Sequence, residues 1–120
     1  MSDITTPMMN VLERALNVTA KRHELVVTNM ANIDTPGYRT KDLDFRSELQ
    51  RAGAPNETTS LASVRNVSGL VQRPDGNDVS IDREGLLLAE TQMQFGLGIQ
   101  LMQREFHNLL LAINEGNKSS

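Results

Sequence analysis

The sequence contains no cysteine and no tryptophan, and only 3% of its 120 residues are aromatic. Without cysteine there can be neither a disulfide framework nor a thiolate metal site, and the chain suits an oxidising or a reducing compartment equally well. With so few bulky aromatic anchors, a long, thin helical protein fits the composition better than a compact globule. The N-terminus lacks a secretory signal, and no apolar run reaches the roughly 18 residues of a membrane span. Any export must therefore use a route that removes no signal peptide.

The sequence also lacks the charge pattern and the side-chain groupings of common functional sites. The net charge is −3 and no basic stripe is present, which argues against nucleic-acid binding. His23 and His107 are the only imidazoles, and neither lies in a metal-binding or triad-like motif. The acids between residues 42 and 82 do not follow the calcium-loop pattern. We therefore expect no catalytic residue, no metal, no cofactor and no small-molecule substrate.

The N-terminal third predicts one long helix over residues 8–32. Thr6 can cap it, and Pro7 suits its first turn. One face carries residues at alternating spacings of four and three: Leu12, Leu16, Thr19, His23, Val26, Met30 and Ile33. Such a helix would be about 37 Å long. A helix of that length needs an equally long partner.

The C-terminal third predicts that partner over residues 82–114, with Gly116 as its stop. The same spacing recurs at Leu88, Gln92, Phe95, Ile99, Met102, Phe106, Leu109 and Ile113. A second row widens the apolar face: Leu86, Ala89, Met93, Leu97 and Leu101. An intramolecular hairpin accounts for the narrow seam, whereas the extra width favours contact with further subunits. We expect an assembly seam of Leu12, Leu16, Val26, Met30, Leu88, Phe95, Ile99, Met102, Phe106, Leu109 and Ile113.

Residues 53–77 are rich in Ser, Thr, Asn, Gly and Pro, and they predict an irregular, extended segment with a turn at residues 74–76. The expected fold is all-α: long terminal helices paired as a coiled-coil-like hairpin, joined by this segment, in which short β-strands can form. The expected divisions are an N-terminal helix (1–33), a turn and following segment (34–52), the polar insert (53–77), a C-terminal helix (78–116) and a tail (117–120).

The most distinctive local pattern follows the first helix, at residues 29–38. Asn32 is suited to end a helix, and Pro36-Gly37 fits the central pair of a type II turn. We call residues 31–38 the signature turn. Its candidate functional residues are Asn29, Ala31, Asn32, Thr35, Pro36, Gly37 and Tyr38. Beyond it, Asp42, Asp44 and Phe45 are expected to pack the emerging segment against a helix.

The residues 31–38, Ala-Asn-Ile-Asp-Thr-Pro-Gly-Tyr, resemble the signature of the bacterial flagellar rod and hook protein family. The continuation Lys-Asp-Leu-Asp-Phe at 41–45 and the entry to the last helix at 77–84 are similar to that family too. The short length and this continuation are most similar to its proximal rod members. Larger members carry an added middle domain, for which residues 53–76 leave no room.

The resemblance implies a structural role in the flagellar basal body. The resemblance implies that the subunits pair their terminal helices in the core of a helical tube. That tube transmits motor torque and encloses the export channel. The resemblance further implies flagellar type III export without a cleaved signal peptide, assembly in the periplasm and a requirement for motility. The implied partners are copies of the chain, other rod subunits, the adaptor to the inner-membrane (MS) ring and the export gate. The alternative is a soluble helical-hairpin adaptor or export chaperone in the cytoplasm.

Overall fold

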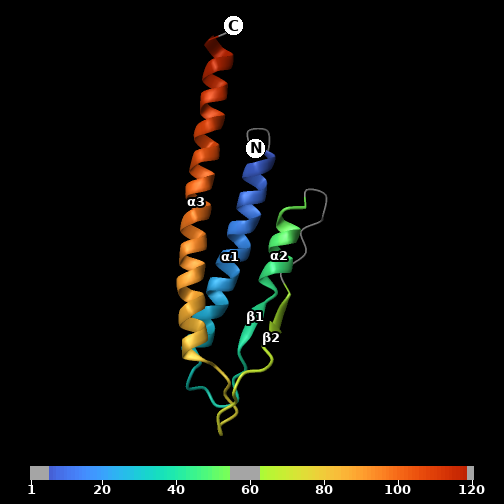
Figure 1. The fold of residues 1–120 in the computed structure, drawn as a ribbon, viewed down its shortest axis with the longest axis vertical. Helices are drawn as coiled ribbons and strands as arrows, with labels where there is room; N and C mark the ends of the chain where they lie inside the picture. Colours follow the sequence, from blue (N-terminus) through green and yellow to red (C-terminus); the bar gives the residue numbers. More distant parts are fainter. Residues whose placement is uncertain (1–5, 55–62, 119–120) are drawn as a thin grey trace.

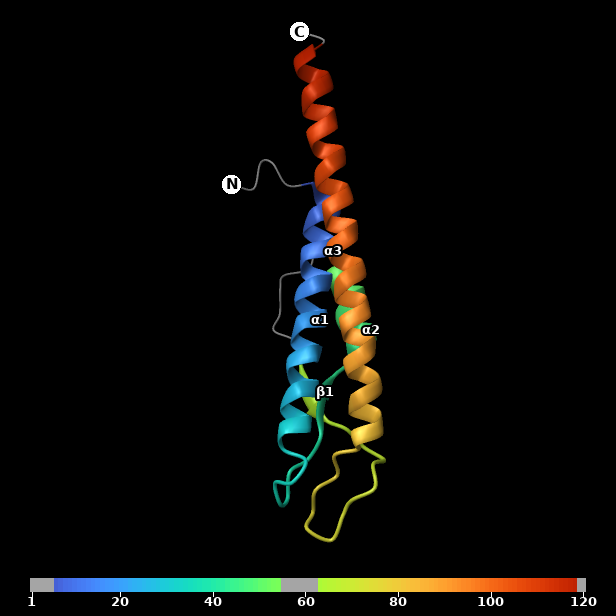
Figure 2. The same cartoon turned by 90° about the vertical axis from the view of Figure 1, so that its left-hand side faces the viewer.

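The computed structural model describes residues 6–54 and 63–118. Parts of the expected segments 1–33, 53–77 and 117–120 lie outside these ranges. The described elements are α1 (Pro7–Ala31), β1 (Lys41–Leu43), α2 (Phe45–Ala52), β2 (Val64–Asn66) and α3 (Ile81–Lys118). Figures 1 and 2 show α1 and α3 side by side along an elongated molecule, with α2 and the strands beside α1. The predicted class, two long paired terminal helices with an irregular middle, is confirmed.

The start of α1 follows the predicted capping. Thr6 is extended and its hydroxyl accepts a hydrogen bond from the backbone N–H of Met9 at 3.0 Å, and Pro7 occupies the first turn. At the other end Asn32 is the C-cap, and its backbone N–H donates to the carbonyls of Thr28 and Asn29. The helix therefore begins and ends within one residue of the predicted 8–32.

The end of α3 differs from the prediction. Gly116 was expected to stop the helix, but α3 continues to Lys118. Among the described glycines, a positive φ occurs only at Gly37, Gly69 and Gly76. Gly116 therefore does not take the left-handed conformation that ends many helices. As an exposed residue inside the helix, it destabilises α3 by only about 1 kcal/mol relative to alanine.

Three short elements lie between the long helices in the described ranges: β1, α2 and β2. The sequence analysis allowed for short strands but did not predict α2. Asp44 caps α2 by accepting a hydrogen bond from the backbone N–H of Ser47, and Glu48 lies in its first turn. Strands β1 and β2 pair antiparallel, with Asp42 opposite Arg65. This pairing holds the middle of the chain against α1, near the end of the hairpin where α1 stops.

The two long helices are of unequal length. The Thr6 hydroxyl, at the start of α1, donates to a carboxylate oxygen of Glu105 at 3.1 Å. Residues 106–118 of α3 therefore continue past this level for about 20 Å. The molecule measures 72 × 26 × 20 Å. No helix in the described ranges combines the length and apolar character needed to cross a membrane.

Candidate functional site

The signature turn lies at the closed end of the hairpin, where the chain leaves α1. Gly37 has φ of +77°, and the backbone N–H of Tyr38 donates to the Thr35 carbonyl at 3.2 Å. Pro36 and Gly37 are thus the central pair of the predicted turn, and a side chain at Gly37 would strain the backbone. The Thr35 hydroxyl donates to the side-chain carbonyl of Asn32 at 3.0 Å, which ties the turn to the cap of α1. Ala31 and Pro36 are exposed.

A second turn, just before α3, is hydrogen-bonded to the signature turn. Its centre is Asn77, whose side chain is fully buried and donates to the carbonyls of Asn32 and Thr35, both at 2.8 Å. The Asn77 side-chain oxygen accepts from the backbone N–H of Val79 at 2.8 Å. The backbone N–H of Gly37 also donates to the Asp75 carbonyl at 2.8 Å. The two turns therefore form one unit that joins the exit of α1 to the entrance of α3.

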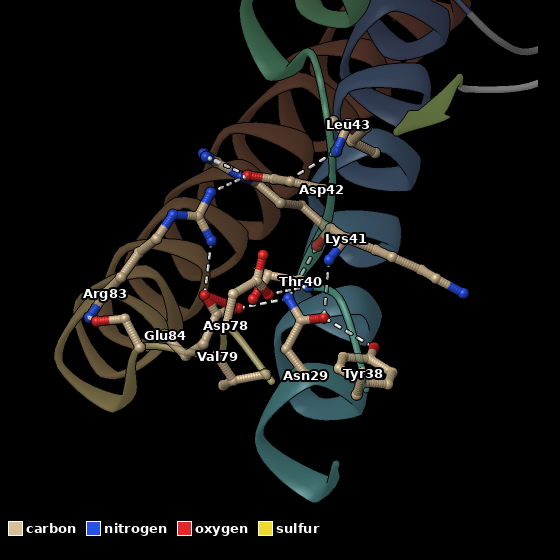
Figure 3. A network of polar contacts seen from close by, with 12 residues as sticks. Asn29, Tyr38, Thr40, Lys41, Asp42, Leu43, Asp78, Val79, Arg83 and Glu84 are labelled. Atoms are coloured by element: carbon tan, nitrogen blue, oxygen red, sulfur yellow. Dashed lines mark hydrogen bonds and ion pairs between the residues drawn. The ribbon is translucent and has the colours of Figure 1, made fainter. Parts of the chain in front are cut away.

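Asn29, in the last turn of α1, is the centre of a buried polar cluster (Figure 3). Its amide nitrogen donates to the Lys41 carbonyl at 2.8 Å and to a carboxylate oxygen of Glu84 at 2.5 Å. Its amide oxygen accepts from the Tyr38 hydroxyl at 2.9 Å and from the backbone N–H of Lys41 at 3.1 Å. Every polar group of this side chain is satisfied, so Asn29 connects α1, β1 and α3.

Asp42 joins the same three elements through charge. Arg22 of α1 donates to its carboxylate at 3.2 and 3.1 Å, and Arg83 of α3 donates to it at 2.7 Å. Arg83 also donates to Glu84 at 2.6 Å, so two arginines and two carboxylates form one network. We call the residues Arg22, Asn29, Tyr38, Asp42, Asp78, Arg83 and Glu84 the polar clasp.

Asp78 completes the clasp on the α3 side. Its carboxylate accepts from the backbone N–H of Thr40 at 2.6 Å and from Arg39 at 3.0 Å. Its backbone N–H donates to the Tyr38 carbonyl at 3.3 Å. Asp78 therefore ties the start of β1 to the entrance of α3.

The clasp shifts the pKa of each of its aspartates downward. Burial would raise the pKa of Asp42, but the hydrogen bond and charge of Arg22, with the Leu43 N–H and Arg83, outweigh burial. Burial likewise opposes the backbone N–H of Thr40 and the Arg39 side chain at Asp78, and the pKa is again lowered. Both groups are therefore held as carboxylates at neutral pH.

Tyr38 shows the opposite effect. Burial raises the pKa of its hydroxyl, and the negative charges of Glu84 and Asp78 raise it further. The phenol stays protonated and can donate to Asn29.

Asp44 and Phe45 lie one step further along the chain. Asp44 caps α2, and hydrogen bonds from the Ser47 side chain and backbone lower the pKa of its carboxyl. Phe45 is half-buried, and the Arg22 guanidinium lies 4.9 Å from the centre of its ring. This contact joins α2 to α1, so Arg22 supports both the clasp and the α2 packing.

The residues of the expected assembly seam are spread over several environments. Val26 is buried, and six others are half-buried: Leu12, Leu16, Met30, Leu88, Met102 and Leu109. Phe95, Ile99, Phe106 and Ile113 are 38–47% exposed and form what we call the outer row. Contacts with α1 or its cap are made by four residues of α3 spaced by seven, Glu84, Thr91, Gly98 and Glu105, of which Gly98 and Glu105 directly precede Ile99 and Phe106. The lone chain therefore does not cover the outer row.

Sequence reasoning did not select several residues of the site. Arg22 was assigned no role, and Asn77, Arg83 and Glu84 entered only as part of the family resemblance at residues 77–84. One signal could have found Glu84: it stands seven residues before Thr91 and fourteen before Gly98, at positions of α3 that face one side. The arrangement holds segments together through buried hydrogen bonds and ion pairs, which is the chemistry of a structural joint.

Curated relatives of this chain share one description. The flagellar basal body rod protein FlgB of Salmonella typhimurium is 28% identical over 126 residues, covering 88% of this chain and 91% of the relative. The Escherichia coli K12 protein of the same name has the same identity and coverage. That of Aquifex aeolicus is 33% identical over 106 residues, covering 75% of this chain and 84% of the relative.

No protein-family model matches the chain. The relatives nevertheless span most of its length. Their shared description agrees with the elongated helical hairpin and its structural joint. The chain belongs to the FlgB family of flagellar basal body rod proteins.

Proposed function

We propose that this protein is a structural subunit of the proximal rod of the flagellar basal body, and that it assembles with its own copies and other rod proteins. The observation that carries the proposal is the apolar surface of α3. Outside the outer row, large apolar side chains are also exposed on other sides of the helix: Leu86, Met93, Leu97, Leu101, Leu110 and Leu111. These exposed side chains contribute little burial energy to the fold of a lone hairpin.

Neighbouring subunits would convert this exposed surface into binding energy. Burying one large aliphatic or aromatic side chain contributes about 1.5–3 kcal/mol, so covering a few per subunit stabilises an assembly substantially. The exposed groups of α3 point in several directions, which suits contact with more than one neighbour. Contacts between different surfaces of identical subunits form open helical arrays when they do not close into a ring.

Within such an array, α1 and α3 act as the rod-core helices, and residues 34–52 pack on neighbours. The array transmits motor torque as a drive shaft, encloses the export channel and is required for motility. The subunit passes through the type III export gate and assembles in the periplasm, next to the adaptor of the MS ring. No step of this function calls for catalysis or a cofactor.

The first test uses Ile99→Asp and Phe106→Asp in the full chain. Both side chains are partly exposed, so the isolated variants should keep their helix content. Their free energy of unfolding should stay within about 0.5 kcal/mol of that of the original chain. In the assembly each would place an unpaired carboxylate in an apolar contact, and we expect loss of rod assembly and of swimming. Gln103→Asp is the matched control, since it adds the same charge at an exposed polar position of α3. Normal swimming of both outer-row variants would contradict the proposal.

The second test is the location of the immunolabelled protein in purified basal bodies. Label at the rod supports the proposal. Recovery only in the cytoplasm, with normal basal bodies in a deletion strain, would instead favour the hairpin adaptor or chaperone.

A further inference from the structure

The contact between α1 and α3 is centred on a line of α3 that carries no large apolar side chain, although the neighbouring Leu87 is buried and Leu88, Met102 and Leu109 are half-buried. Four positions spaced by seven residues face α1: Glu84, Thr91, Gly98 and Glu105. We call them the rungs. Two are carboxylates, one is a hydroxyl and one has no side chain. The outer row consists of large apolar residues that remain partly exposed; Ile99 and Phe106 lie about 100° further round the helix than the rungs, and Phe95 about 50°.

Each polar rung has a specific partner on α1 or at its cap. The buried Glu84 carboxylate accepts from Asn29, and the Glu105 carboxylate accepts from the Thr6 hydroxyl. Thr91 is fully buried, and its hydroxyl donates to the Leu88 carbonyl at 3.1 Å. Because its single proton is used there, Nδ1 of His23, 3.0 Å away, is the donor to Thr91.

Gly98 forms a rung by providing space. A Cβ placed on Gly98 would lie 2.5 Å from Leu16 Cδ2 and 3.2 Å from Leu16 Cγ. Leu16 of α1 therefore occupies the volume that any side chain at position 98 would need. Gly96, two residues earlier, would meet nothing within 4 Å, so the requirement for glycine is specific to position 98.

Hydrophobicity alone would favour a different rotation of α3. Turning the helix by one residue position would bring Ile99 and Phe106 against α1 and move Glu84 and Thr91 away from the interface. That rotation separates Asn29 and His23 from their partners and places Ile99, instead of Gly98, against Leu16. Buried polar groups without partners and an overfilled contact are both destabilising.

We propose that the rungs select the face of α3 that turns toward α1, and that they thereby keep the outer row facing outward. The rungs act as specificity elements, because each fits one rotation and penalises the other. This inference concerns the lone chain, so it stands or falls independently of the rod function.

The test is disulfide crosslinking, for which a chain without native cysteine is well suited. The pair Leu16→Cys/Gly98→Cys reports the observed rotation, and Leu16→Cys/Ile99→Cys reports the alternative. At low protein concentration under mild oxidation, the first pair should form an intramolecular disulfide and the second should not. Each pair is then combined with His23→Leu/Thr91→Leu, which replaces one hydrogen-bonded rung by an apolar pair.

We expect the disulfide yield of the second cysteine pair, relative to that of the first, to rise roughly tenfold when this rung is replaced, a ratio equivalent to about 1.4 kcal/mol. Asn17→Leu/Thr28→Leu is the matched control, because it adds two leucines at exposed positions of α1 and should leave the ratio unchanged. Thr6→Leu/Glu105→Leu removes a different rung and keeps the test open if the first rung variant does not fold. An unchanged ratio in a helical variant, or equal crosslinking of both pairs in the original background, would overturn the proposal.

Discussion

Single buried side chains hold the closed end of the hairpin together. Asn77 makes three hydrogen bonds to backbone groups of two separate segments, and Asn29 makes four to α3, β1 and Tyr38. Short amides suit this position because they carry donors and an acceptor without a net charge to desolvate. The signature turn therefore depends on residues more than forty positions away in the sequence.

Asn77→Ala should destabilise the isolated chain by about 3 kcal/mol, because it leaves two carbonyls and one backbone N–H without their partner. Urea unfolding followed by circular dichroism measures the change. Gln72→Ala is the control: this exposed side chain makes one hydrogen bond, to the Gly76 carbonyl. An equal effect of the two substitutions would show that Asn77 is not the joint.

The aspartates of the clasp predict lower stability in acid. Both have a folded-state pKa below the ordinary value of 3.8, so the unfolded chain binds more protons as the pH falls. Their contribution is complete well above pH 4 and is lost as the pH drops below about 4, through the lowered folded-state values. The urea midpoint should fall between pH 5 and pH 3, and Asp42→Asn should reduce that dependence. A midpoint independent of pH would contradict the ionic role of the clasp.

At the scale of elements, α3 contains glycines with different roles. Gly98 makes room for Leu16, whereas a Cβ on Gly96 would meet nothing within 4 Å. Glycine inside a helix is destabilising by roughly 1 kcal/mol relative to alanine, so only the first of these positions has a structural reason in the lone chain. The contact at Gly98 is between the α3 backbone and the Leu16 side chain.

Gly96→Ala should therefore stabilise the isolated protein by about 1 kcal/mol. Gly98→Ala should gain less or lose stability, because Leu16 must move. Thermal unfolding of the two variants beside the original measures the difference. In a Leu16→Ala background the two substitutions should become equivalent, and a persistent difference there would count against the Leu16 contact.

At the scale of the whole molecule, the hairpin is firmly joined at one end and extends at the other. The clasp and the two turns gather near the end of α1, and α2 lies beside its middle (Figure 1). Residues 106–118 of α3 continue beyond the start of α1 (Figure 2), and Phe106, Leu110, Leu111 and Ile113 are exposed there. The chain thus separates a self-sufficient joint from a surface that a monomer leaves uncovered.

The isolated protein should associate as its concentration rises, since contact between copies removes this apolar surface from water. Sedimentation velocity across a concentration series measures the association. Ile113→Asp should weaken it and Asn114→Asp should not, because Asn114 is already polar and exposed. A monomer at all concentrations would show that copies of the chain do not recognise this surface by themselves.

The amino-acid sequence alone determined the two long helices, their capping at Thr6 and Asn32, and the Pro36-Gly37 turn, because capping, turn formation and periodicity are local properties. It did not reveal α2, which is short and rests on the Asp44 cap and on packing against Arg22. Only the tertiary structure decided which face of α3 turns inward. Periodicity points to the most apolar stripe, while the observed face follows from hydrogen bonds to Asn29, His23 and Thr6 and from the space at Gly98. Those partners are separated by tens of residues and meet only when the chain is folded.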